Sequence, residues 1–217
     1  MLVKTYVVAG LGRFGSAVAL RLSELGCQVL AIDKSPEAIQ PIADYVTHAV
    51  VGDTQDQEVL RALGVRNYDC AIVAMGSDLA GSVLTTLNFK ELGMPKIICK
   101  AHDAAHQKVL EKVGADRVVI PEQEIARKLA QSLSSSNVLD FIELSKDFGI
   151  VEFSAPSAWH GKTLKELNIR AKSGVNIIAI RRSGNIQVAP GPDFTIDPQD
   201  TLVALGKYEA LDLVQKL

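Results

Sequence analysis

The sequence predicts an α/β protein, in which a Rossmann-like, doubly wound parallel sheet is followed by a crossover helix and a small α+β C-terminal domain. Two observations support this prediction. Over residues 1–120, short apolar runs alternate with amphipathic stretches, as in parallel strands that are buried on both faces and joined by helices. Beyond residue 149, shorter strand-like runs are separated by tight-turn signals, which is typical of antiparallel strands.

The N-terminal strands are predicted from their apolar, β-branched composition. They are Thr5–Ala9, Val29–Ile32, Ala49–Val51, Ala71–Ala74, Ile97–Lys100 and Arg117–Ile120. Two of the intervening apolar stripes stop at Gly26 and Gly93, where a helix commonly ends in a left-handed residue. Because strand–helix–strand crossovers are right-handed, we expect one open sheet of about six strands.

The C-terminal part begins with a helix predicted from about Gln123 to Leu133, which a polar break at residues 134–137 ends. Ser183-Gly184-Asn185 is a hairpin signal between two apolar runs, and a last helix is predicted over Tyr208–Leu217. We therefore predict a Rossmann-like lobe at 1–122, a crossover helix and hinge at 123–148, and a small lobe at 149–217.

Composition excludes several classes of protein. With 23 basic and 25 acidic side chains, a net charge of −2 and 5% aromatic residues, the chain does not resemble a nucleic-acid binder. Its three cysteines lack metal or disulfide spacing, so we expect them to be reduced. It has neither a run of about 18 apolar residues nor a signal-peptide pattern. We therefore expect a cytoplasmic protein that does not insert into the membrane; if it acts on a membrane process, it does so through a partner.

The segment Gly10-Leu11-Gly12-Arg13-Phe14-Gly15 joins the first strand to the first helix. In such a loop Gly10 permits the tight turn, Gly12 lets the backbone approach a phosphate group, and Gly15 lets the helix pack against the sheet. Asp33 ends the second strand, where a carboxylate accepts ribose hydroxyls and repels a 2′-phosphate. These residues predict a nucleotide site that disfavours NADP.

Charged residues at the same edge bear on which nucleotide binds. Arg13 within the loop suits more phosphate charge than a dinucleotide carries, and Lys100 adds a second cation at the end of the fifth strand. Glu122 follows the sixth strand, and an acid that faces phosphate needs a cation between them. Arg13 alternatively lies on a solvated surface, and Glu122 alternatively stabilises a helix N-terminus.

Other polar residues follow the third and fourth strands. Asp53-Thr54 and Met75-Gly76-Ser77-Asp78 are expected at the carboxyl edge, where Asp53 either meets the adenine or caps the helix ahead of Glu58. His106, on a predicted helix, is a candidate contact for phosphate or ribose. The sequence has no catalytic signature with a nucleophile and a base, so we do not predict an enzyme.

Several segments together resemble the RCK, or KTN, family of regulatory subunits, which combine a TrkA-N and a TrkA-C domain. The segments that carry the resemblance are Gly10–Gly15, Val29–Asp33, Ile72–Gly76, Lys108–Asp116, Ile120–Glu122 and Asn168–Lys172. The resemblance extends over essentially the whole chain. It implies a protein that regulates potassium uptake, assembles as a homo-octameric ring of dimers and docks on a membrane potassium-channel subunit.

The resemblance also implies that ATP and ADP bind the N-terminal lobe and hold the dimers at different angles. Arg13 would then reach the terminal phosphate in the partner subunit, and Asp33 would hold the ribose, with Lys34 and Ser35 beside it. Glu122 would face the phosphates through a divalent cation, Mg²⁺ or Ca²⁺, or through Na⁺.

The adenosine would be bordered by Met75, Gly76, Ser77, Lys100 and His106. The family often has Asn where this chain has Asp53, so the adenine contact is open. Two alternatives remain: a regulatory module that senses NAD(H), and a small NAD-dependent oxidoreductase.

In the C-terminal lobe the resemblance implies dimerisation and a second ligand, cyclic di-AMP. The matching residues are Ile169, Arg170, Asn176, Ile177 and Pro192. An ordinary dimer core is the alternative explanation for these residues.

Overall fold

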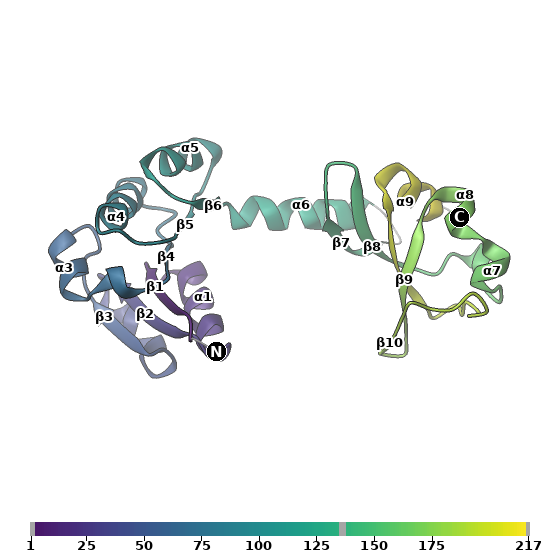
Figure 1. Ribbon diagram of the computed structural model, residues 1–217, viewed down its shortest axis with the longest axis horizontal. Helices are drawn as coiled ribbons and strands as arrows, with labels where there is room; N and C mark the ends of the chain where they lie inside the picture. The colour runs from purple at the N-terminus through teal and green to yellow at the C-terminus, as the bar shows by residue number, and fades with distance from the viewer. Residues whose placement is uncertain (1–2, 135–137, 216–217) are drawn as a thin grey trace. The chain divides into compact units, whose positions relative to one another are not determined.

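The computed structural model describes residues 3–134 and 138–215, and the chain forms two compact units, one up to Glu122 and one from Gln123 onward (Figure 1). Most of the break predicted at 134–137 and the end of the last predicted helix (216–217) lie outside the described residues. Among the described residues, no helix is both long enough and apolar enough to cross a membrane.

The N-terminal unit contains a six-stranded parallel sheet in the order β3-β2-β1-β4-β5-β6. Its strands are β1 (Thr5–Ala9), β2 (Gln28–Asp33), β3 (His48–Val51), β4 (Cys70–Val73), β5 (Ile97–Lys100) and β6 (Arg117–Val119). This order reverses between β1 and β4, as in Rossmann folds, and it confirms the predicted doubly wound sheet.

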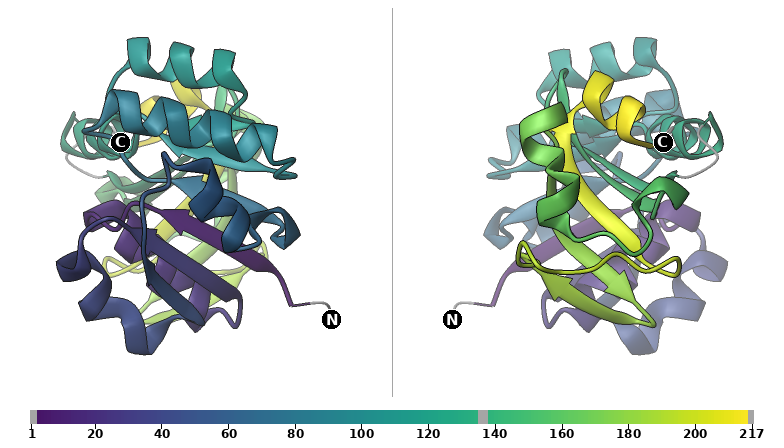
Figure 2. Two further views of the ribbon diagram at one scale, coloured as in Figure 1. Left: turned by 90° about the vertical axis from the view of Figure 1, so that its left-hand side faces the viewer. Right: turned by 90° about the vertical axis from the view of Figure 1, so that its right-hand side faces the viewer.

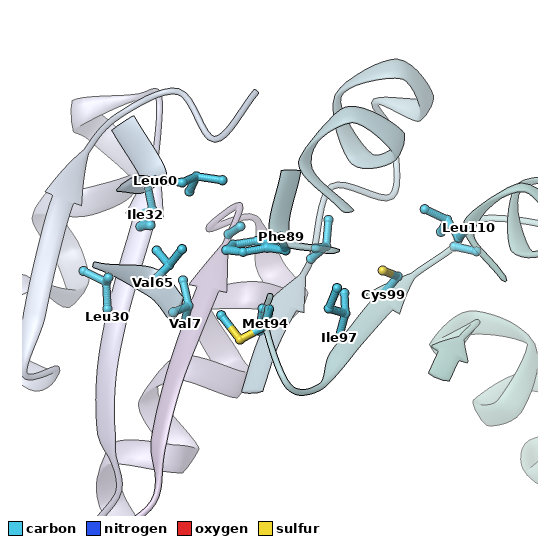
Figure 3. Packing of buried hydrophobic residues seen from close by; sticks show 14 of the residues in the cluster. Val7, Leu30, Ile32, Leu60, Val65, Phe89, Met94, Ile97, Cys99 and Leu110 are labelled. Carbon is cyan, nitrogen blue, oxygen red and sulfur yellow. The ribbon is translucent and has the colours of Figure 1, made fainter. Parts of the chain in front are cut away.

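Helices cover both faces of this sheet. They are α1 (Arg13–Glu24), α2 (Pro36–Ile39), α3 (Gln57–Ala62), α4 (Leu79–Glu91) and α5 (Ala104–Val113), with 3-10 turns η1 (Gln40–Tyr45) and η2 (Val65–Asn67). On one face Phe89 and Leu110 are fully buried in one cluster with strand residues such as Ile97, and Figure 3 shows side chains of this cluster along the sheet. On the other face Ala19 and Ile39 pack against residues of β1 and β2.

The C-terminal unit is built on a five-stranded sheet in the order β10-β9-β11-β8-β7, in which all neighbours are antiparallel. β11 lies in its centre (Figure 2, right). The helix α6 (Pro121–Ser134) starts in the last two residues of the N-terminal unit and continues into the C-terminal unit. The elements after it are β7 (Val138–Glu143), β8 (Phe148–Ser154), η3 (Ser157–Trp159), α7 (Leu164–Leu167), α8 (Ile169–Ser173), β9 (Asn176–Arg182), β10 (Asn185–Val188), β11 (Thr201–Lys207) and α9 (Tyr208–Gln215). The strand β7, inside the interval predicted as crossover and hinge, is the edge of this sheet.

The turn between β9 and β10 illustrates why the sequence folds locally as it does. Arg182 pairs with Asn185 across a two-residue loop in which Ser183 and Gly184 have φ values of 48° and 83°. Two positive φ values define the turn that matches the twist of paired strands. The hairpin predicted from Ser183-Gly184-Asn185 is thus present.

Candidate functional site

The carboxyl ends of the parallel strands form a crevice at the point where the strand order reverses. A larger cavity of about 740 Å³ and a smaller one of about 250 Å³ open there, and they share Gly12, Ala74 and Ser77 in their walls. The larger is also lined by Arg13, Gly76, Lys100, His102 and Glu122. The smaller is also lined by Gly10, Asp33, Lys34, Gly52, Asp53, Thr54, Gln55, Met75 and Asp78. Open α/β sheets bind ligands at this position.

The glycine loop has the geometry that its sequence predicts. Gly10 has a φ of 90°, in the region that favours glycine, and its amide donates to Ile32 O at 2.9 Å. A Cβ on Gly15 would overlap the carbonyl oxygen of Gly10, so only glycine lets α1 approach β1 this closely. A Cβ on Gly12, which lines the crevice, would meet no atom within 4 Å. The loop therefore leaves open the space that a phosphate group needs at the N-terminus of α1.

Asp33 fastens this loop to the second strand. One carboxylate oxygen accepts from the amide of Leu11 at 2.6 Å, and the other accepts from the amide of Ser35 at 2.9 Å. Each oxygen keeps a further lone pair, and the side chain is only partly buried. Asp33 is thus held at the wall of the smaller cavity in a position to accept hydroxyl groups.

Two other predicted residues of the smaller cavity, Asp53 and Thr54, have structural partners within the protein. Asp53 accepts from the amide of Gln55 at 2.9 Å, and it is Asp56, not Asp53, that caps α3. Thr54 is 1% exposed and its hydroxyl is 2.8 Å from that of Thr85, so its side chain points to the interior. The hypothesis that Asp53 is a helix cap is therefore wrong.

The larger cavity is dominated by charge. Lys100 Nζ lies 2.6 Å from Glu122 Oε1 and 5.6 Å from the centre of the Phe14 ring, while the side chain of Lys100 is 17% exposed. Its stem passes over Gly76, where a Cβ would stand 3.2 Å from Lys100 Cε. The absence of a side chain at Gly76 thereby lets the ammonium group of Lys100 reach the cavity, where it lies over the ring of Phe14.

Glu122 is a carboxylate held in its charged form. Its hydrogen bond from Lys100 lowers its pKa most, and the charge of the exposed Arg13 contributes less. The described residues contain no group of three or more His, Cys, Asp or Glu that could hold a metal ion. A cation at Glu122 would therefore depend on phosphate and water oxygens for its other ligands, which suits Mg²⁺.

The histidines differ from the prediction. His106 is fully buried: its Nε2 lies 2.7 Å from Ser82 Oγ and its Nδ1 lies 3.1 Å from His102 Nδ1. Because of this burial, its side chain does not reach the crevice. The half-exposed His102 lines the larger cavity instead.

Sequence reasoning also missed Gly52, Gln55 and Ala74 as wall residues. Gly52 and Ala74 directly follow β3 and β4. The rule that ligands bind at the carboxyl ends of parallel strands would have found both. Gln55 lies at the wall of the smaller cavity, in the turn where its amide donates to the side chain of Asp53. The sequence around Gln55 did not indicate this position.

The residues predicted for a second ligand lie on α8, on β9 and in the loop before β11. Ile169 is 7% exposed and belongs to the core, whereas Arg170 beside it on α8 is exposed. Asn176 and Ile177 lie on β9, and Pro192 precedes β11 and accepts from the amide of Lys165 at 2.8 Å. Ile169 thus serves packing, and Arg170 is the charged member that remains accessible.

The fold and the glycine loop together are those of a Rossmann-type protein. Comparison with known proteins identifies the family more narrowly. The TrkA-N domain model matches residues 6–121 and the TrkA-C domain model matches residues 149–217. The chain therefore belongs to the family that combines these two domains.

Two relatives from Bacillus subtilis resemble the chain over nearly its full length. Ktr system potassium uptake protein C is 43% identical over 98% of this chain and 96% of its own length. Ktr system potassium uptake protein A is 44% identical over 94% of this chain and 91% of its own. A solved structure described as the GsuK channel bound to NAD has a TM-score of 0.69 at 19% identity, covering 99% of this chain and 39% of that one, which shows the fold alone.

Proposed function

We propose that this chain is the regulatory subunit of a Ktr-type potassium-uptake system, and that it converts the nucleotide bound in its N-terminal crevice into gating of a membrane channel subunit. Near full-length identity to Ktr system proteins supports the potassium-uptake role. A regulatory role also suits the crevice, since the sequence carries no nucleophile–base signature.

The observation that carries the choice of ligand is the cationic cavity beside the glycine loop. Arg13 and Lys100 both line it, next to the open space at Gly12. Two cations and a helix N-terminus suit the terminal phosphates of ATP or ADP, while Asp33 in the smaller cavity suits the ribose. We therefore favour an adenosine di- or triphosphate over NAD(H).

Competition on the purified full chain tests this choice. ATP, ADP and NADH should each be titrated against a fluorescent adenine nucleotide, and the adenosine phosphates should displace it at lower concentration. Preference for NADH would favour the NAD(H)-sensing alternative. Oxidation of NADH on addition of a substrate would favour the oxidoreductase.

Gating requires that two ligands stabilise different arrangements, because a ligand shifts an equilibrium only by its differential affinity. Arg13 is exposed at the start of α1, so it can reach a terminal phosphate bound in a neighbouring subunit. ATP would gain this contact and ADP would not. Glu122 would add a cation, Mg²⁺, Ca²⁺ or Na⁺, that bridges it to the phosphates once Lys100 turns toward the ligand.

Such a contact between subunits requires an assembly, for which we propose a homo-octameric ring of dimers. On α6 the apolar residues Ile125, Leu129 and Leu133 recur at helical spacing and are 64%, 57% and 77% exposed, which leaves an apolar face for another copy to cover. Light scattering of the full chain, with and without ATP, measures the number of copies.

For the C-terminal unit we propose cyclic di-AMP as a second ligand, with Arg170 as its charged contact. Titration of cyclic di-AMP into the wild type and into Arg170→Ala tests this assignment. Equal affinity of the two proteins would leave these residues as a dimer core.

A further inference from the structure

One face of α4 carries two polar side chains, Thr85 and Asn88, that the proposed function does not use. They lie three residues apart, so they share a face of the helix. Thr85 is fully buried and Asn88 is partly buried. Neither is among the residues that line the smaller cavity, but each is hydrogen-bonded to residues that do. Their role is therefore to be sought in the wall that they contact.

Asn88 holds the loop that follows β3. Its side-chain nitrogen Nδ2 donates to Thr54 O at 3.2 Å and to Gln55 O at 2.9 Å. The reverse orientation of the side-chain amide would bring its oxygen against these two carbonyl oxygens, so the hydrogen-bond network itself assigns the donor. Asn88 thus fixes the backbone of two residues that line the smaller cavity.

Thr85 joins the same loop to the residue that lines the cavity after β4. Its hydroxyl donates to Met75 Sδ at 3.7 Å, and its oxygen lies 2.8 Å from Thr54 Oγ1. Because the proton of Thr85 is directed at the sulfur, Thr54 is the donor in the hydroxyl pair. Thr54 and Thr85 are 1% and 0% exposed, so water does not replace this bond when it is lost.

These bonds also fix the distance between two carboxylates of the cavity wall. Asp53 lies on the loop that Asn88 holds, whereas Asp78 is the N-cap of α4 itself. Asp53 accepts from the amide of Gln55 at 2.9 Å, and Asp78 accepts from the amide of Gly81 at 2.8 Å. Each carboxylate keeps further lone pairs for a ligand.

We propose that Thr85 and Asn88 are positioning residues, which hold the loop after β3 against α4 and thereby set the preference of the smaller cavity for an adenine base. The inference rests on the proposed function, since it assumes that the nucleoside part of ATP occupies this cavity. The amino group of adenine can donate to a carboxylate, whereas uracil presents a carbonyl oxygen that a carboxylate repels. Such discrimination requires a wall held at hydrogen-bond distance, because these bonds weaken steeply with poor geometry.

Calorimetric titration of ATP and of UTP into the full chain tests the proposal. The two nucleotides share the ribose and the triphosphate, so a change in the phosphate site or in the folded fraction cancels in the ratio of their affinities. We expect the wild type to bind ATP about tenfold more tightly than UTP. Thr85→Val and Asn88→Leu, which remove the bonds and keep similar shapes, should each reduce this ratio roughly threefold to tenfold.

Two variants on the same helix serve as controls. Thr85→Ser keeps the hydroxyl and should retain most of the wild-type ratio. Thr86→Val also removes a buried hydroxyl, but this hydroxyl donates to Ser82 O at 2.7 Å and lies 3.2 Å from Cys99 Sγ, away from both loops. Thr86→Val should therefore keep the wild-type ratio, whatever it does to stability.

The possible outcomes separate this inference from the proposed function. An unchanged ratio in Thr85→Val and Asn88→Leu, with ATP still bound, would overturn the positioning role and leave the proposed function intact. So would equal affinity of the wild type for ATP and UTP, or an equal fall of the ratio in Thr86→Val. Failure of the wild type to bind either nucleotide would overturn both. If Thr85→Val does not fold, Asn88→Leu, at a partly buried position, decides the test.

Discussion

The two sheets of this protein use their polar groups differently. In the N-terminal unit all neighbouring strands are parallel, so the loops after the strands meet at one edge and bring Arg13, Lys100 and His102 to a common cavity. In the C-terminal unit all neighbouring strands are antiparallel. The carboxyl ends of its strands therefore alternate between the two opposite ends of the sheet and do not meet at one site. There the buried Asp200 accepts from Arg182 Nε at 2.6 Å and Nη2 at 2.7 Å.

The polar groups of Asp200 serve the fold, whereas those at the N-terminal cavity are the ones that we assign to a ligand. Asp200 also accepts from the amide of Asp197 at 2.9 Å, and its side chain is fully buried, so its bonds are made within the unit. Arg13 and Glu122 are exposed at a cavity. Substitutions at the first kind should lower stability, and substitutions at the second should change ligand binding.

The largest effect is expected from Gly15→Val, because its side chain would overlap the carbonyl oxygen of Gly10 and push α1 away from β1. We expect a loss of about 3 kcal/mol or more in the free energy of unfolding, measured by urea denaturation. The control is Gly12→Ala, whose methyl group enters open space. It should keep the stability and weaken nucleotide binding; equal loss of stability in both would remove the distinction between packing and ligand glycines.

Asp200→Asn tests the structural pair in the other unit. Removing the charge leaves Arg182 without its ionic partner, and since Arg182 is 42% exposed the expected cost is about 2 kcal/mol. The exposed Asp193→Asn is the matched control and should change stability by less than about 0.5 kcal/mol.

The pKa of the Asp200 carboxyl predicts how the stability of the protein depends on pH. Burial raises the pKa of Asp200, but the bonds from Arg182 and Asp197 outweigh burial and lower it. Asp200 therefore contributes fully to the free energy of unfolding above about pH 4, the usual pKa of an Asp in an unfolded chain. This contribution is lost as the pH falls through the lower pKa that Asp200 has in the folded protein. Asp200→Asn should reduce the acid sensitivity of unfolding; an unchanged profile would contradict the pairing.

Arg13→Ala tests a residue assigned to the ligand. We expect nucleotide binding to persist and the difference between ATP and ADP in potassium flux to disappear, because one charge-assisted contact contributes on the order of 1.5–3 kcal/mol, about tenfold to a hundredfold. The measurement is flux through reconstituted channel and regulatory subunits. Arg21→Ala, on the same helix and paired with Glu24, is the control. A mutant that still distinguishes the nucleotides would exclude the contact between subunits.

Glu122→Gln should have the smallest effect. It removes a carboxylate ligand, so the affinity of a divalent cation for the ATP-loaded protein should fall severalfold while ATP still binds. Calorimetric titration of Mg²⁺ measures this change, with Glu124→Gln, an exposed neighbour on α6, as control. Equal Mg²⁺ affinity in all three proteins would remove Glu122 from the site.

Much of the N-terminal site was predictable because parallel topology and local pattern agree there. Gly10 and Gly15 perform the structural roles that their spacing indicates, and Asp33 lies at the wall of the crevice where its place after the second strand predicts it. His106 was misplaced because its sequence neighbourhood does not reveal that Ser82, on another helix, faces it from the interior. In the C-terminal unit, the burial of Ile169 likewise depends on packing partners distant in the chain.

The sequence by itself determined the alternation of strands and helices in the N-terminal unit and the glycine loop, because these depend on apolar periodicity and on backbone conformations open to few residues. Only the tertiary structure decided that Lys100 pairs with Glu122 and that His102, not His106, lines the cavity. Those outcomes depend on which side chains from separate elements meet, and on whether each polar group finds its partner within the protein or at an open surface.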